Sequence, residues 1–161
     1  MQKDKLTDKL FIYQNKEHFR YGIDAVLLAH FALELEGRVL DLGSGTGILP
    51  LLLSGLDSLS EIVGLELQKE ALELAKKSVQ DNGLSNKITL VQGDLMEIEN
   101  LFSRESFDGL ICNPPYFEKN HGLACKDMAR TISRSEEAMT LDGLLRAVAY
   151  LLKPRAPIYM I

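Results

Sequence analysis

The glycine-rich segment at residues 41–47, Asp-Leu-Gly-Ser-Gly-Thr-Gly, constrains the fold of this 161-residue chain more than any other feature. It overlaps the end of a short expected strand at 38–43 and precedes an apolar segment that is expected to form a helix through about Leu56. Glycine adopts the backbone angles of tight turns and lets a ligand approach the main chain closely. The segment therefore predicts a buried strand, a glycine turn and a helix that has Pro50 in its first turn.

Strands and helices alternate along the rest of the chain. Further strands are expected at 61–67, 88–94, 107–113 and from 157 onward, and further helices at 24–35, 68–82 and 141–153. The first helix is expected to begin at the N-cap Asp24 and to stop at Gly37. The second is expected to stop at Gly83, and the third to begin at the cap Thr140 and to end at Pro154. Alternation of this kind predicts a doubly wound, Rossmann-like α/β fold with a parallel sheet and helices on both faces. In such folds, ligands bind beyond the carboxyl ends of the strands.

Composition narrows the class of protein. The chain is 46% hydrophobic and 25% charged, which is typical of a globular domain. No apolar run approaches the roughly 20 residues of a membrane-spanning helix, and the charged N-terminus has no signal sequence, so we expect a cytoplasmic protein. Cys112, Cys125 and the three scattered histidines form no ligand set with metal-site spacing, so we expect no metal.

The charge balance bears on nucleic-acid binding. The chain has 18 basic and 23 acidic residues, which gives a net charge of −5. Proteins that bind nucleic acid over a broad face usually carry a basic surplus. We therefore expect any RNA contact to be local. The loop at 117–139 has lysines and arginines for phosphates, but acidic residues dilute them, so a solvated loop is an equal alternative.

The glycine turn differs from the dinucleotide fingerprint. Its third glycine would fall at position 48, which is Ile48, and an acid, Asp41, precedes the turn. Asp41 would repel a pyrophosphate, whereas it suits a cationic ligand such as an ammonium or sulfonium group. The following helix N-terminus can hold a carboxylate. The alternative is a tight turn that binds no ligand.

Two further acids are expected at the same end of the sheet. Glu66 lies at the end of the second strand, where a carboxylate can accept both ribose hydroxyls of an adenosine. Asp94 follows the third strand and could accept a hydrogen bond from an adenine amino group. The alternatives are a solvated surface acid for Glu66 and a helix cap or turn residue for Asp94.

The segment Asn113-Pro114-Pro115-Tyr116 follows the fourth strand and predicts chemistry at an amino nitrogen. An amino nitrogen on an aromatic ring is a poor nucleophile because its lone pair is delocalised. The Asn113 side-chain oxygen and the Pro114 carbonyl can accept hydrogen bonds from its two N–H groups and so favour the pyramidal nitrogen. Consecutive prolines stiffen the turn, and Tyr116 offers a stacking face for a flipped base. The alternative is a proline-stiffened loop without a ligand.

These four motifs, in this order, resemble the class I methyltransferases that use S-adenosylmethionine. The Asn-Pro-Pro-Tyr form is similar to enzymes that methylate planar nitrogens in adenine, in guanine or in the glutamine amide of release factors. The segment at 19–31, FRYGIDAVLLAHF, resembles the bacterial family that methylates the adenine exocyclic amine in valine tRNA. The resemblance implies a tRNA (adenine-N6) methyltransferase. A methyltransferase acting on another acceptor and a silent cofactor-binding remnant are the alternatives.

The resemblance also implies roles for particular residues. The residues implied in catalysis are Asn113, Pro114 and Tyr116, and those implied in substrate binding are Pro115, Tyr116, Phe117 and Arg130. The residues implied in cofactor binding are Tyr21, Asp24, Asp41, Gly43, Gly45, Gly47, Glu66, Asp94 and Asn113.

We expect a single domain over 1–161, with an N-terminal extension at 1–36, a cofactor-binding core at 37–116 and a substrate loop and helix at 117–161. The family's sheet continues with a C-terminal hairpin that this chain lacks, so the fold is expected to be truncated after about the fifth strand. The apolar segment at 158–161 would then form an open sheet edge. Exposed edges pair with other chains, so we expect either that the chain is partial or truncated or that a homo-oligomer covers the edge.

Overall fold

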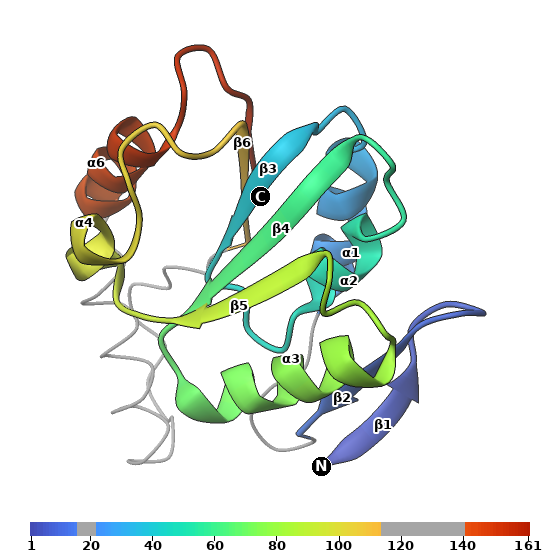
Figure 1. Cartoon of the computed structure of the whole chain (residues 1–161). Helices are drawn as coiled ribbons and strands as arrows, with labels where there is room; N and C mark the ends of the chain where they lie inside the picture. Colours follow the sequence, from blue (N-terminus) through green and yellow to red (C-terminus); the bar gives the residue numbers. More distant parts are fainter. Residues whose placement is uncertain (16–21, 114–140) are drawn as a thin grey trace.

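The computed structural model describes residues 1–15, 22–113 and 141–161. Figure 1 shows the whole chain with most of its elements labelled. In chain order they are β1 (Gln2–Lys5), β2 (Phe11–Gln14), α1 (Ile23–Phe31), β3 (Gly37–Leu42), α2 (Ile48–Leu53), β4 (Leu59–Glu66), α3 (Lys69–Asp81), β5 (Ile88–Gln92), the 3-10 helix η1 (Leu95–Glu97), α4 (Ile98–Leu101), β6 (Gly109–Cys112), α6 (Leu141–Leu151) and β7 (Ile158–Met160).

Five parallel strands form the central sheet, in the order β5-β4-β3-β6-β7. Helices α1, α2 and α3 cover one face of this sheet, and α4 and α6 cover the other (Figure 1). Each face buries its own apolar cluster, and alternate residues of β3 belong to the two clusters: Val39 to one, Leu40 and Leu42 to the other. The predicted doubly wound, Rossmann-like α/β fold is confirmed.

Strand β7 forms one edge of the described sheet. The side chains of Ile158 and Met160 are 48% and 50% exposed there. This agrees with the expected open edge. Pairing of the edge with a second copy of the chain stays a prediction.

The first predicted helix has different boundaries in the structure. Helix α1 begins at Ile23 with Gly22 at its N-cap, so Asp24 is not the capping residue. Asp24 lies in the first turn, where a carboxylate faces the positive end of the helix dipole. The helix ends at Phe31 rather than at residue 35. Gly37 is not its stop but the first residue of β3, with a φ of 70°.

The other helices lie close to the predicted ranges. Helix α2 ends at Leu53, three residues before the predicted end, and Pro50 is in its first turn. The amphipathic pattern of α3 predicts a buried stripe of Ala71, Leu74, Ala75 and Val79. The helix buries three of these residues, whereas Leu74 is half-buried. Gly83 follows α3 with a φ of 69°, which glycine adopts without strain.

The N-terminal hairpin of β1 and β2 was not predicted. Its strands pair antiparallel, and the free edge of β2 lies against α3. The Phe11 amide donates to Asn82 Oδ1 at 2.9 Å, and the Phe11 carbonyl accepts from Asn82 Nδ2 at 2.6 Å. The Tyr13 amide donates to Ser78 Oγ at 2.8 Å, and the Tyr13 hydroxyl donates to Asp81 Oδ2 at 2.7 Å. Side chains of α3 thus complete the edge of β2 as a neighbouring strand would.

Replacing Asn82 with alanine should loosen this hairpin. The change removes both hydrogen bonds to Phe11. Each lost bond should lower the free energy of unfolding by about 1 kcal/mol. We expect faster amide hydrogen exchange at Phe11 and Tyr13, while the amides of β3 keep their exchange rates. Gln80→Ala, an exposed residue of the same helix, is the control. Unchanged exchange at Phe11 would contradict the role of Asn82.

Candidate functional site

The predicted motifs lie together at one edge of the sheet. In the observed register Asp41 of β3 lies beside Gly64 of β4 and Ile111 of β6, and Glu66 lies beside Gln92 of β5. All four strands run parallel, so their carboxyl ends meet at one edge. That edge carries, in strand order, Asp94 after β5, Glu66 at the end of β4, the glycine turn after β3 and Asn113 after β6.

The glycine turn follows β3 and is fastened to β4. The amides of Gly43 and Ser44 both donate to the Leu65 carbonyl, at 3.0 and 2.9 Å. Gly43, Gly45 and Gly47 have φ values of 78°, 56° and 84°, which favour glycine at each position. A Cβ on Gly47 would lie 3.2 Å from the Ala75 side chain, whereas one on Gly45 would meet no described atom within 4 Å. The turn is therefore packed at Gly47 and open at Gly45.

Asp41 is a buried acid without a partner. Its side chain is 0% exposed, and neither of its carboxylate oxygens makes a hydrogen bond to the described part of the chain. Burial raises the pKa of Asp41 from 3.8 to about 7; the nearby Ser44 hydroxyl opposes this rise, and the charge of Glu66 adds to it. The Ser44 hydroxyl is near enough to Asp41 to lower the pKa of its carboxyl group. It nevertheless makes no hydrogen bond of ordinary geometry to either carboxylate oxygen. A buried, unpartnered carboxylate is costly, so this position favours a cationic ligand.

Glu66 connects the glycine turn to the start of α3. One carboxylate oxygen accepts from the Gly45 amide and the other from the Gln68 amide, both at 2.7 Å. Burial raises the pKa of Glu66, while the bonds from these amides oppose the rise. The solvated-acid alternative is wrong, because the side chain is buried and bonded. Each oxygen can still accept a further hydrogen bond.

Asp94 caps η1. Its Oδ1 accepts a hydrogen bond from the Met96 amide at 2.9 Å. The helix-cap alternative is therefore confirmed for this oxygen. The contact with an adenine amino group is compatible with the cap, since a carboxylate has a second oxygen, and it stays a prediction.

Asn113 is half-buried and directly follows β6. Because Asp41 and Ile111 are register partners, Asn113 lies at the level of Gly43, one strand away from the glycine turn. Asp24 is half-buried in the first turn of α1. The other predicted site residues lie outside the described residues: Tyr21, Pro114, Pro115, Tyr116, Phe117 and Arg130.

Cys112 is a core residue, as its apolar strand predicts. It is 0% exposed, and its thiol donates to the Leu42 carbonyl at 3.1 Å. Burial raises the pKa of this thiol to about 12, so it is neutral and unreactive near pH 7.

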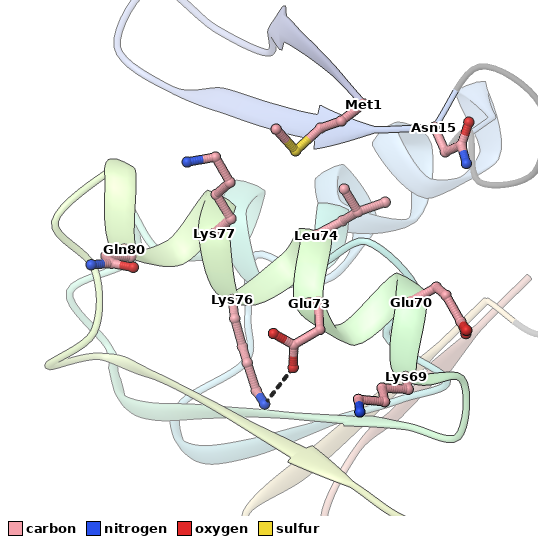
Figure 2. Close-up of a pocket in the computed structure, with 9 residues that line it drawn as sticks. All are labelled: Met1, Asn15, Lys69, Glu70, Glu73, Leu74, Lys76, Lys77 and Gln80. Carbon is pink, nitrogen blue, oxygen red and sulfur yellow. Dashed lines mark hydrogen bonds and ion pairs between the residues drawn. The ribbon is translucent and has the colours of Figure 1, made fainter.

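A groove of about 840 Å³ that the sequence did not predict lies between α3 and the N-terminal hairpin. Figure 2 shows the Glu73–Lys76 ion pair, of length 3.0 Å, on the α3 side of this groove. Its lining includes three lysines and two glutamates of α3: Lys69, Lys76, Lys77, Glu70 and Glu73. None of the lining residues belongs to the glycine turn. The mixed charge differs from the basic surplus of a typical nucleic-acid surface.

No helix within 1–15, 22–113 or 141–161 is long and apolar enough to cross a membrane. In the same ranges, no three histidine, cysteine or acidic side chains are grouped so that they could hold a metal ion.

Two curated relatives of this chain are named for the same activity. The tRNA1(Val) (adenine(37)-N6)-methyltransferase of Porphyromonas gingivalis is 31% identical over 149 residues, which cover 88% of this chain and 58% of the relative. The protein of the same name from Bacteroides thetaiotaomicron is 35% identical over 146 residues, which cover 88% of this chain and 59% of the relative. The chain thus spans less than two-thirds of the length of these curated relatives.

A solved structure shows the same fold. The tRNA (uracil-54, C5)-methyltransferase of Pyrococcus abyssi, in complex with S-adenosyl-L-homocysteine, has a TM-score of 0.56 at 23% identity, covering 71% of this chain and 28% of that protein. The fold of this chain is therefore that of the class I methyltransferases. The model of the methyltransferase small domain family matches residues 21–158, and the chain belongs to that family.

Proposed function

We propose that this chain is an S-adenosylmethionine-dependent methyltransferase that transfers a methyl group to the exocyclic amino nitrogen of adenine in tRNA, in the cytoplasm. The observation that carries the proposal is the buried, unpartnered Asp41 carboxylate beside the open glycine turn, with Asn113 on the next strand at the same edge. The names of the two relatives support adenine in tRNA as the substrate.

The residues at the carboxyl edge fit this cofactor. S-adenosylmethionine supplies a methyl group bound to a positively charged sulfur, and it also carries an ammonium group. Asp41 would receive the ammonium group, which would supply the positive charge that the described surroundings of this carboxylate lack. The open side of Gly45 would let the cofactor approach the main chain of the turn.

Glu66 and Asp94 would hold the adenosine part of the cofactor. Glu66 has its carboxylate fixed by two amides, so its remaining acceptor sites are pre-oriented for the two ribose hydroxyls. Asp94 would accept from the adenine amino group. Gly43 and Gly47 would shape the turn, and Tyr21 and Asp24 would close the cofactor pocket.

Asn113 would bind the amino nitrogen that receives the methyl group. Its side-chain oxygen would accept a hydrogen bond from one N–H of the amino group, and the carbonyl of Pro114 would accept a hydrogen bond from the other N–H. Two acceptors at fixed positions favour the pyramidal nitrogen with a localised lone pair. Pro115, Tyr116 and Phe117 would enclose the base, and Arg130 would contact a phosphate of the RNA.

The direct test is transfer of labelled methyl from S-adenosylmethionine to unmodified bulk tRNA, followed by digestion to nucleosides. We expect the label in N6-methyladenosine, because Asn113 lies at the edge that carries Asp41 and Glu66. A release factor with an unmodified glutamine serves as the parallel acceptor. Label in the protein alone would replace adenine by a glutamine amide as the substrate, and no label in either would leave a silent cofactor-binding remnant.

A further inference from the structure

We propose that Ser44 is a positioning residue for the cofactor: its buried hydroxyl donates to the Asp41 carboxylate and orients it toward the ammonium group. This inference rests on the proposed function, because the ammonium group is that of S-adenosylmethionine. Ser44 lies between two glycines of the turn and was not among the predicted site residues.

Three buried oxygens without a hydrogen-bond partner lie together at this position. In the described part of the chain, four buried side-chain oxygen atoms lack a partner: both carboxylate oxygens of Asp41, the hydroxyl of Ser44 and the hydroxyl of Ser106. The first three share one end of β3. Each unsatisfied buried polar group costs about 1–3 kcal/mol, so three in one place indicate a site built for further donors.

The backbone holds Ser44 firmly while its hydroxyl lacks a partner. The Ser44 amide donates to the Leu65 carbonyl at 2.9 Å, and the Ser44 carbonyl accepts from the Gly47 amide at 2.9 Å. The side chain is buried, with the residue 3% exposed. The hydroxyl is therefore the part of Ser44 that is still available to donate a hydrogen bond.

Gly64 of β4 provides the space for this side chain. A Cβ on Gly64 would lie 2.7 Å from Ser44 Oγ and 3.1 Å from Ser44 Cβ. Gly64 is also the register partner of Asp41. The strand beside Asp41 therefore has no side chain where the Ser44 hydroxyl lies, which keeps the hydroxyl near the carboxylate.

The charges around Asp41 explain why a donor is needed there. The titratable group whose charge raises the pKa of Asp41 is Glu66 on β4, and the charge of Asp41 in turn raises the pKa of the buried Cys112 thiol on β6. No described cation forms an ion pair with Asp41. The Ser44 hydroxyl is the polar group that favours the ionised carboxylate, and an ammonium group binds that ionised form.

The test combines cofactor binding with titration of Asp41 in the empty protein. S-adenosylhomocysteine, which carries the same ammonium group, is titrated by calorimetry into wild type and Ser44→Ala. The carboxyl carbon of Asp41 is followed by NMR against pH. We expect Ser44→Ala to bind about tenfold more weakly. We also expect the Asp41 midpoint to move to higher pH, and Ser44→Thr, which keeps the hydroxyl, to retain the wild-type midpoint.

Ser106→Ala is the matched control, because it removes the other buried, unpartnered hydroxyl, which precedes β6 at the opposite end of the sheet. It should leave both affinity and midpoint unchanged. If the titration midpoint of Asp41 is unchanged in Ser44→Ala, the inference is overturned. This holds even if the affinity falls, because the hydroxyl would then contact the cofactor directly and would not act through Asp41. Absence of binding by the wild-type chain would instead overturn the proposed function, so the two failures come from different measurements.

Discussion

Replacing Asn113 with alanine should abolish methyl transfer and leave cofactor affinity within about threefold of wild type. The change removes one of the two acceptors that hold the target amino group, while Asp41, Glu66 and the glycine turn keep their contacts. Loss of one pre-organised electrostatic contact of this kind typically costs about 100- to 1000-fold in rate. Labelled methyl transfer to tRNA measures the rate, and calorimetry with S-adenosylhomocysteine measures the affinity.

Asn100→Ala is the control for this experiment, because Asn100 is an exposed residue of α4, which covers one face of the sheet. It should retain the wild-type rate. Transfer by Asn113→Ala at more than about a tenth of the wild-type rate would contradict the role of Asn113. A parallel loss of cofactor binding would show that Asn113 acts on the cofactor rather than on the base.

The elements around the site were predictable because their signals are local. A buried strand followed by glycines with positive φ has few alternatives, and β3 with its turn follows the prediction closely. The carboxyl-edge placement of Glu66 and Asn113 followed from parallel topology alone. These inferences need only the order of elements along the chain.

What the sequence did not predict depends on partners far along the chain. Strand β2 is a short segment whose edge is completed by Ser78 and Asn82, 65 and 71 residues away in sequence. Gly37 was expected to stop a helix but begins β3 instead. Glycine is needed at this position because a Cβ would lie 2.4 Å from the side chain of Asp108, which is distant in sequence. The unpartnered hydroxyl of Ser44 becomes visible only when Gly64 is placed beside it.

Replacing Asp41 with asparagine should remove cofactor binding and yet stabilise the empty protein at neutral and alkaline pH. Asparagine is nearly the same size but cannot pair with an ammonium group as an ion. Removal of one partner of a buried ion pair costs about 3–5 kcal/mol, which is a loss of affinity of at least about a hundredfold. Calorimetry with S-adenosylhomocysteine measures this loss.

The stability effect has a definite sign. The ordinary pKa of an aspartate, 3.8, applies to Asp41 in the unfolded chain, and the pKa is about 7 in the folded chain. Folding therefore favours the protonated acid. The contribution of this group to stability is therefore fully present below pH 3.8 and is lost as pH rises through about 7. A shift of this size corresponds to a loss on the order of 4 kcal/mol. Urea unfolding between pH 4 and 8 should show the stability of Asp41→Asn relative to wild type increasing with pH and levelling above neutrality.

Asp108→Asn should show the opposite dependence and serves as the matched control. Asp108 accepts from Lys153 Nζ at 2.6 Å and from the Arg38 amide at 2.8 Å, and these bonds hold its pKa below the ordinary value. Its stabilising contribution is present at neutral pH and is lost as pH falls through that lowered pKa, so the variant should be less stable than wild type at pH 7 and the deficit should shrink in acid. If the two variants instead changed with pH in the same direction, Asp41 would not be a buried acid whose pKa is raised by folding.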